Sequence, residues 1–139
     1  ILPTLLVDGM AESLIKSRAK KIMICNLVNK PGHTDDYLVN DFVEKLEEYL
    51  NPNFFEYVIY NNNTHLNPKL LKKYLDDDEL PVKFNLELFE NKKYKAIGAD
   101  IISQDNISKN KGDKLIQKRN LIRHDSNKLA KLIMQIYFN

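Results

Sequence analysis

The polar residues best placed for binding chemistry follow a short apolar run near the start of the chain. Residues 22–25 (Ile-Met-Ile-Cys) read as a buried strand, and Asn26 comes directly after it. A polar turn then leads through Thr34 and Asp35 into a helical pattern. Backbone N–H groups at a helix start, together with the Thr34 hydroxyl, can hold a phosphate. The alternative is a tight turn in which Thr34 or Asp35 is an ordinary N-cap.

Other polar side chains could contact the same ligand. Asn61 and Asn62 follow an apolar strand pattern, and their amides could read a base edge or ribose hydroxyls; otherwise they are turn residues that tolerate left-handed backbone. Arg123 has the planar fork that binds phosphate oxygens in pairs, unless it forms a surface ion pair with Asp125, which would be worth little. His33 lacks the partners of a catalytic base, and the three histidines lack metal-ligand spacing.

Composition narrows the class of protein. The chain has 139 residues, of which 43% are hydrophobic and 29% charged, so it is long enough for one globular domain. A net charge of +2 is too small to argue for a nucleic-acid or anionic-membrane partner, and we expect neither nucleic acid nor a membrane span. The single cysteine, Cys25, is expected to be a buried, reduced thiol, which fits the cytoplasm. The apolar start, residues 1–7, is interrupted by Pro3 and is neither a signal peptide nor a membrane span.

The spacing of apolar residues predicts the elements that position these side chains. Strands are expected at 21–27, 55–60 and 94–99, with a short edge strand at 82–84. Helices are expected at 9–17, 38–50, 68–75 and from 125 or 126 to 137. The polar segment 103–113 is expected to be a mobile loop.

Two helices carry apolar stripes that we expect to be core. The stripe of 38–50 includes Tyr49, and the stripe of the last helix includes Tyr137. Asp8 is expected to cap the first helix. Strands that alternate with helices indicate an α/β fold with a mostly parallel sheet. The strand exits at 29–36, 61–64 and 100–103 should therefore gather along one edge as a cleft.

Five blocks of sequence resemble a known family. They are residues 8–12 (DGMAE), 19–27 (AKKIMICNL), 30–37 (KPGHTDDY), 57–62 (YVIYNN) and 121–125 (LIRHD). In this order they resemble the carboxyl-terminal half of the YvcK proteins, called gluconeogenesis factors, of the CofD (2-phospho-L-lactate transferase) superfamily. The resemblance implies a Rossmann-like α/β fold. It also implies that residues 1–139 are the carboxyl-terminal portion of one domain, without its glycine-rich amino-terminal half, which fits a start other than Met.

The resemblance implies a ligand as well as a fold. It implies a cytoplasmic protein that binds a UDP-sugar such as UDP-N-acetylglucosamine and acts in carbon metabolism, cell shape and cell-wall synthesis; a homodimer is left open. It adds Tyr74, whose ring could stack on uracil or instead be a core tyrosine. The ligand-binding residues expected on this basis are Asn26, Gly32, His33, Thr34, Asp35, Asn61, Asn62, Tyr74 and Arg123.

Three functions fit these observations. The first, which we favour, is a regulator that binds a UDP-sugar without catalysis, without a metal and without another cofactor. The second is a CofD-like transferase that moves a phospholactyl group with Mg²⁺, but His33 stands where the family has a glutamate. The third is a structural or interaction domain whose site has decayed.

Overall fold

A sheet of three parallel strands lies at the centre of the part of the chain that the structure describes. The structure is a computed structural model, and it describes residues 1–66, 68–76, 78–103 and 122–138. The strands are β1 (Ile22–Ile24), β2 (Tyr57–Asn61) and β3 (Lys95–Ala99), in the order β1-β2-β3. Met23 pairs with Val58, and Ile59 pairs with Ile97. The predicted parallel α/β sheet is confirmed.

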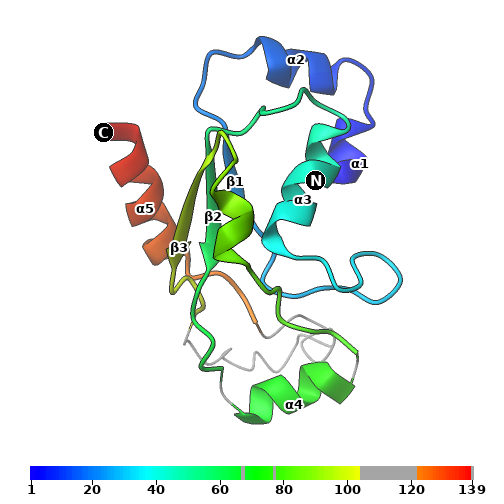
Figure 1. Ribbon diagram of the computed structural model, residues 1–139, viewed down its shortest axis with the longest axis vertical. Helices are drawn as coiled ribbons and strands as arrows, with labels where there is room; N and C mark the ends of the chain where they lie inside the picture. Colours follow the sequence, from blue (N-terminus) through cyan, green and yellow to red (C-terminus); the bar gives the residue numbers. More distant parts are fainter. Residues whose placement is uncertain (67, 77, 104–121, 139) are drawn as a thin grey trace, which may run out of the picture.

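Helices cover both faces of the sheet (Figure 1). The helix α3 lies on one face and α5 on the other, while α4 lies beyond the carboxyl ends of the strands. The helical elements are α1 (Leu2–Leu5), α2 (Met10–Lys16), α3 (Val39–Glu47), α4 (Pro68–Asp76), the 3₁₀ helix η1 (Leu86–Phe89) and α5 (Ser126–Phe138). The sequence reasoning missed α1 and η1, which are only four residues each and too short to show a period.

The period of two along the strands divides the core between the two faces. Met23, Val58 and Tyr60 pack in the layer that contains α3. Ile59 and Ile97 point the other way and pack in the layer that contains α5. Cys25 is 1% exposed, as predicted, and burial raises the pKa of its thiol to about 12.

A close contact between β2 and β3 leaves no room for a side chain at Gly98. The ring of Tyr60 lies across Gly98, where a Cβ would be 2.7 Å from the Tyr60 hydroxyl oxygen. The same ring packs against Phe84 and Phe89, with ring centroids 4.9 Å and 5.2 Å away. Glycine at 98 therefore gives Tyr60 its place in the core.

The helix boundaries correct several expectations. The N-cap of α2 is Gly9 and not Asp8. Gly9 takes φ +74°, a left-handed conformation that glycine adopts easily, and no side chain among the described residues caps this helix. The helix α3 ends at Glu47, so Tyr49 falls beyond it and is 39% exposed. Tyr137 lies in the last turn of α5 and is 67% exposed, whereas its neighbour Ile136 is 6% exposed and packs in the core.

The predicted edge strand at 82–84 is wrong as a regular strand. Pro81 and Lys83 form isolated bridges to Val28 and Leu38. The bridge of Pro81 is antiparallel and the bridge of Lys83 is parallel, so the two cannot belong to one continuous ladder. The loop predicted at 103–113 lies outside the described residues beyond Ser103.

Candidate functional site

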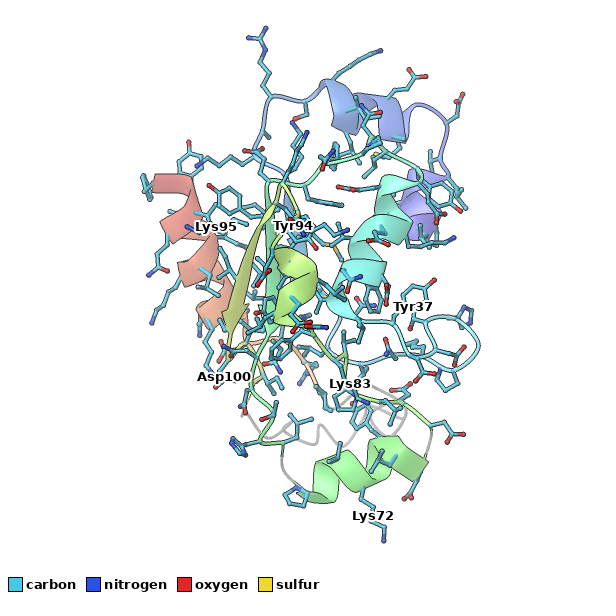
Figure 2. All side chains as sticks on the ribbon, in the orientation of Figure 1. Tyr37, Lys72, Lys83, Tyr94, Lys95 and Asp100 are labelled. Atoms are coloured by element: carbon cyan, nitrogen blue, oxygen red, sulfur yellow. The ribbon has the colours of Figure 1, made fainter. Side chains whose placement is uncertain are left out.

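The exits of β2 and β3 are joined by a polar network, as the predicted gathering of strand exits requires. The Asn63 amide donates to Asp100 Oδ1 at 3.2 Å, and Lys128 Nζ lies 2.9 Å from Asp100 Oδ2. Asp100 lies near the carboxyl end of β3 in Figure 2. The Lys128 ammonium holds the pKa of the Asp100 carboxyl below its usual value. This carboxylate is therefore engaged in tying α5 to the sheet.

His124 joins the exit of β1 to the segment before α5. Its Nε2 lies 3.1 Å from the carbonyl oxygen of Cys25. Because a carbonyl can only accept, Nε2 carries the hydrogen and the neutral ring keeps a lone pair on Nδ1. Burial lowers the pKa of His124 below its ordinary value, which favours this neutral form.

A polar cavity of about 210 Å³ lies between these two segments. It is lined by Asn26, Leu27, Val28, Lys30, Ile122 and His124. Asn26 was predicted from its place at a strand exit, whereas the sequence reasoning did not select Lys30 and His124, which also line this cavity. A signal for His124 was present in the block 121–125, but its bond to Cys25 joins residues 99 apart in the sequence. In open α/β sheets ligands bind outside the carboxyl ends of the strands, so this cavity is the candidate site.

A larger cavity, of about 400 Å³, lies at the opposite end of the sheet. Its wall is mostly apolar and includes the side chains of Leu5, Met23, Leu46, Leu50 and Phe55. It gathers few polar groups that could orient a ligand, and it lies away from the carboxyl edge. We therefore place the candidate site in the smaller cavity.

The turn expected to hold a phosphate at a helix start is separate from the helix. Thr34 Oγ1 accepts the Lys30 N–H at 2.9 Å, and Asp35 Oδ1 accepts the Gly32 N–H at 3.0 Å. The helix α3 begins at Val39, and its N-cap is Leu38. Thr34 and Asp35 are therefore not the N-cap of α3, and this turn does not form a phosphate cradle at the start of that helix.

The loop that contains this turn closes on itself. The Asn29 amide donates to the carbonyl of Tyr37 at 3.0 Å. Figure 2 labels Tyr37 at the end of the loop, which swings away from the sheet. His33 is exposed within it, and neither His33 nor Gly32 lines the cavity at the exit of β1.

The asparagines at the end of β2 bond to their own neighbours and to the end of β3. The Asn61 amide donates to the carbonyl of Asn63 at 2.8 Å, and Asn62 donates its backbone N–H to Ala99 at 3.1 Å. The left-handed reading is wrong, because these asparagines have no positive φ. Neither Asn61 nor Asn62 lines the cavity that Asn26 lines.

Tyr74 lies in the core and is 5% exposed. Its hydroxyl oxygen accepts the backbone N–H of Ile122 at 2.7 Å, which ties α4 to the segment before α5. The ring packs in the same layer as Ile101 and Ile136. This corrects the expectation of a ring presented for stacking on uracil and favours the core reading.

Arg123 is exposed at the carboxyl edge. The alternative reading, an ion pair with Asp125, is wrong. Asp125 Oδ1 instead accepts the N–H groups of Asn127 and Lys128 at 2.9 Å and 3.0 Å and caps α5. Ile122 and His124 line the cavity, whereas Arg123 does not. Because side chains alternate along an extended segment, Arg123 points to the other side. Its guanidinium is therefore open to a ligand outside the cavity.

The described ranges lack two other kinds of feature. No helix there is long and apolar enough to cross a membrane. No group of three or more His, Cys, Asp or Glu side chains in this part of the chain is arranged to hold a metal ion.

Comparison with known proteins identifies similar chains. The sequence model of the family described as "2-phospho-L-lactate transferase CofD" matches residues 1–105. The chain is 33% identical over 136 residues to the "Gluconeogenesis factor" of Bacillus subtilis, covering 98% of this chain and 38% of that protein. It is 29% identical over 139 residues to the "Gluconeogenesis factor" of Listeria innocua, covering 100% of this chain and 38% of that protein.

A solved structure shows the same fold. It is a member of the UPF0052 family from Bacillus halodurans, with a TM-score of 0.78 at 20% identity, covering 96% of this chain and 38% of that one. The chain thus spans about two fifths of the length of these relatives.

Proposed function

The chain belongs to the CofD family, and from this premise we propose that the protein is a regulator that binds a UDP-sugar such as UDP-N-acetylglucosamine. Relatives that match along nearly the whole chain bear the name gluconeogenesis factor. The proposal therefore places the protein in carbon metabolism, with links to cell shape and cell-wall synthesis.

The observation that carries this proposal is the polar cavity at the carboxyl end of β1. It offers an amide from Asn26, an ammonium from Lys30 and an imidazole from His124. Arg123, between the lining residues Ile122 and His124, is exposed, and its guanidinium can donate two parallel hydrogen bonds to the oxygens of a second phosphate. A diphosphate joined to a sugar presents these chemistries in sequence, with anionic oxygens next to hydroxyls.

The second candidate is a transferase of the CofD kind, which the description of the family model favours. Phosphoryl chemistry of this sort depends on positioned phosphates and on metal ions. A response to a guanine nucleotide that requires Mg²⁺ would support this candidate over the regulator.

A thermal-shift series on the protein at its natural length tests the two candidates. The ligands are UDP-N-acetylglucosamine, UDP-glucose, UDP, GDP and buffer, each with and without Mg²⁺. A ligand at a hundredfold excess over its Kd adds about 2.7 kcal/mol to the free energy of unfolding, which raises Tm by several degrees. We expect this shift with UDP-sugars and not with GDP. No shift with either UDP-sugar would refute the proposal.

The role of Arg123 can be tested with a matched pair of variants. Arg123→Ala should weaken UDP-N-acetylglucosamine binding by more than about 1 kcal/mol, because a charged hydrogen bond is lost. Arg18→Ala removes another exposed arginine, before β1 at the opposite end of the sheet, and should leave the affinity unchanged. Equal affinities for the two variants, measured by titration calorimetry, would remove Arg123 from the site.

A further inference from the structure

The wall of the candidate cavity contains unpaired backbone donors. Leu27 and Val28 are 9% and 6% exposed, and both line the cavity. Their N–H groups find no acceptor among the described residues. A buried N–H without a partner costs about 1–3 kcal/mol, so native structures nearly always supply an acceptor. Two adjacent donors in a cavity wall therefore point to an acceptor that occupies the cavity.

The backbone hydrogen bonds on either side of Val28 explain why the N–H of Val28 has no acceptor among the described residues. The Asn29 N–H donates to the carbonyl of Leu80 at 2.7 Å, and the carbonyl of Leu27 accepts the Val82 N–H at 3.0 Å. Antiparallel pairing turns the N–H of the residue between them to the other side. The Val28 N–H therefore points away from segment 80–82 and cannot be satisfied by it.

The charges around the cavity favour an anion. Lys30 is exposed at the rim, and its side chain forms no ion pair within the described part of the chain. No carboxylate side chain is among the described residues that line the cavity. A cavity lined by an ammonium and by residues with unpaired backbone N–H groups, with no opposing carboxylate among the described lining residues, favours an anion.

The remaining polar groups favour hydroxyls beside the anion. The Nε2–H of His124 is engaged by Cys25, so the neutral ring has only an acceptor to offer. Asn26 is exposed and adds an amide oxygen. At about 210 Å³ the cavity lies below the range of about 300–1,000 Å³ typical of whole-ligand pockets, so it suits one part of a larger ligand.

We propose that the cavity at the exit of β1 is the subsite for the sugar-linked phosphate of a glycosyl phosphate, held by Lys30 and the N–H groups of Leu27 and Val28. His124 and Asn26 accept from the sugar hydroxyls next to that phosphate. This inference deepens the proposed function and rests on it for the nucleotide part of the ligand.

Titration calorimetry with three probes tests the subsite in the protein at its natural length. The probes are UDP-N-acetylglucosamine, N-acetylglucosamine 1-phosphate and N-acetylglucosamine, and the variant is Lys30→Met, which keeps the apolar stem and removes the charge. Lys95→Met is the matched control, because Lys95 is an exposed lysine at the opposite end of the sheet (Figure 2). Lys30→Glu is the stronger variant, since it adds repulsion.

The result expected is about tenfold weaker binding of both phosphorylated probes by Lys30→Met, a larger loss with Lys30→Glu and no change with Lys95→Met. The unphosphorylated sugar should bind far more weakly than either phosphorylated probe. Wild-type affinity for UDP-N-acetylglucosamine in both Lys30 variants would overturn the subsite while leaving the proposed function in place.

The two ideas fail in different ways. Binding of N-acetylglucosamine 1-phosphate that depends on Lys30, without binding of the UDP-sugar, would refute the proposed function and support the subsite. No binding of either phosphorylated probe would overturn both.

Discussion

Replacing Gly98 with alanine should destabilise the protein although alanine suits a strand better than glycine does. The new Cβ would stand 2.7 Å from Oη and 2.8 Å from Cζ of Tyr60. Tyr60 is 5% exposed and is held by Phe84 and Phe89, so its ring has little room to withdraw. Overpacking of this kind costs about 1–3 kcal/mol. The gain of about 0.5–1 kcal/mol from replacing glycine in a strand offsets part of that cost. We expect a net loss of about 1–2 kcal/mol.

Equilibrium denaturation in urea measures this loss as a lower midpoint at an unchanged m-value. A double-mutant cycle with Tyr60→Leu identifies the cause, because leucine removes the Tyr60 atoms nearest to the new Cβ. Gly98→Ala should cost less in the Tyr60→Leu background, with a coupling of about 1 kcal/mol or more.

A second glycine provides the matched control for this cycle. Gly32 has φ +73° and nothing within 4 Å of an added Cβ, so Gly32→Ala should cost about 1–2 kcal/mol from backbone strain alone. That cost should simply add to the cost of Tyr60→Leu. If Gly98→Ala costs the same with Tyr60 and with Leu at position 60, the packing account is wrong.

Other groups in the structure allow shorter tests. Lys128→Met should lower the free energy of unfolding by less than about 1 kcal/mol, because the ion pair of Lys128 with Asp100 is partly exposed. Because the pKa of Asp100 is lowered in the folded protein, the stabilisation by this carboxylate is present above the unfolded pKa and should be lost as pH falls through the folded pKa. Thermal melts at a series of pH values should show a weaker pH dependence for Lys128→Met than for the wild type. The pKa of His124 is also lowered in the folded protein, so on acidification the unfolded chain protonates this residue before the folded chain does. Stability should therefore fall as pH drops from about 6.5 towards the folded pKa. His124→Gln should remove this pH dependence, whereas His33→Gln, a control at an exposed histidine, should not. The Cys25 thiol is 1% exposed with a pKa raised to about 12, so iodoacetamide should label it in denaturant and not in the native protein at pH 8; native labelling at the unfolded rate would contradict this burial.

The parallel sheet could be predicted from sequence because its signals are local. The apolar runs that became β1, β2 and β3 are separated by segments with a helical period, and this alternation already indicates crossover connections. The same argument correctly placed the strand exits on one edge, where Asn63 and Asp100 now meet. The apolar stripes were extended too far, since Tyr49 and Tyr137 fit the period of a helix and yet are 39% and 67% exposed.

The candidate site could be predicted only in part. Asn26 was found because it directly follows a strand, and it does line the cavity. The turn at Gly32 was misplaced because residues 32–35 bond among themselves, and no pattern in the sequence reveals that Asp35 accepts from Gly32. Lys30 and His124 were missed because their roles depend on contacts between segments far apart in the chain.

Hydrogen–deuterium exchange with and without UDP-N-acetylglucosamine tests the central claim most directly, since it reports both binding and its place. We expect slower exchange at residues 26–30, where the N–H groups of Leu27 and Val28 would gain an acceptor, and at residues 122–125 on the facing wall of the cavity. UDP and N-acetylglucosamine should each protect less of this region than the complete ligand does. Saturating UDP-N-acetylglucosamine that leaves residues 26–30 unchanged, or that protects only the apolar cavity at the amino ends of the strands, would contradict the account.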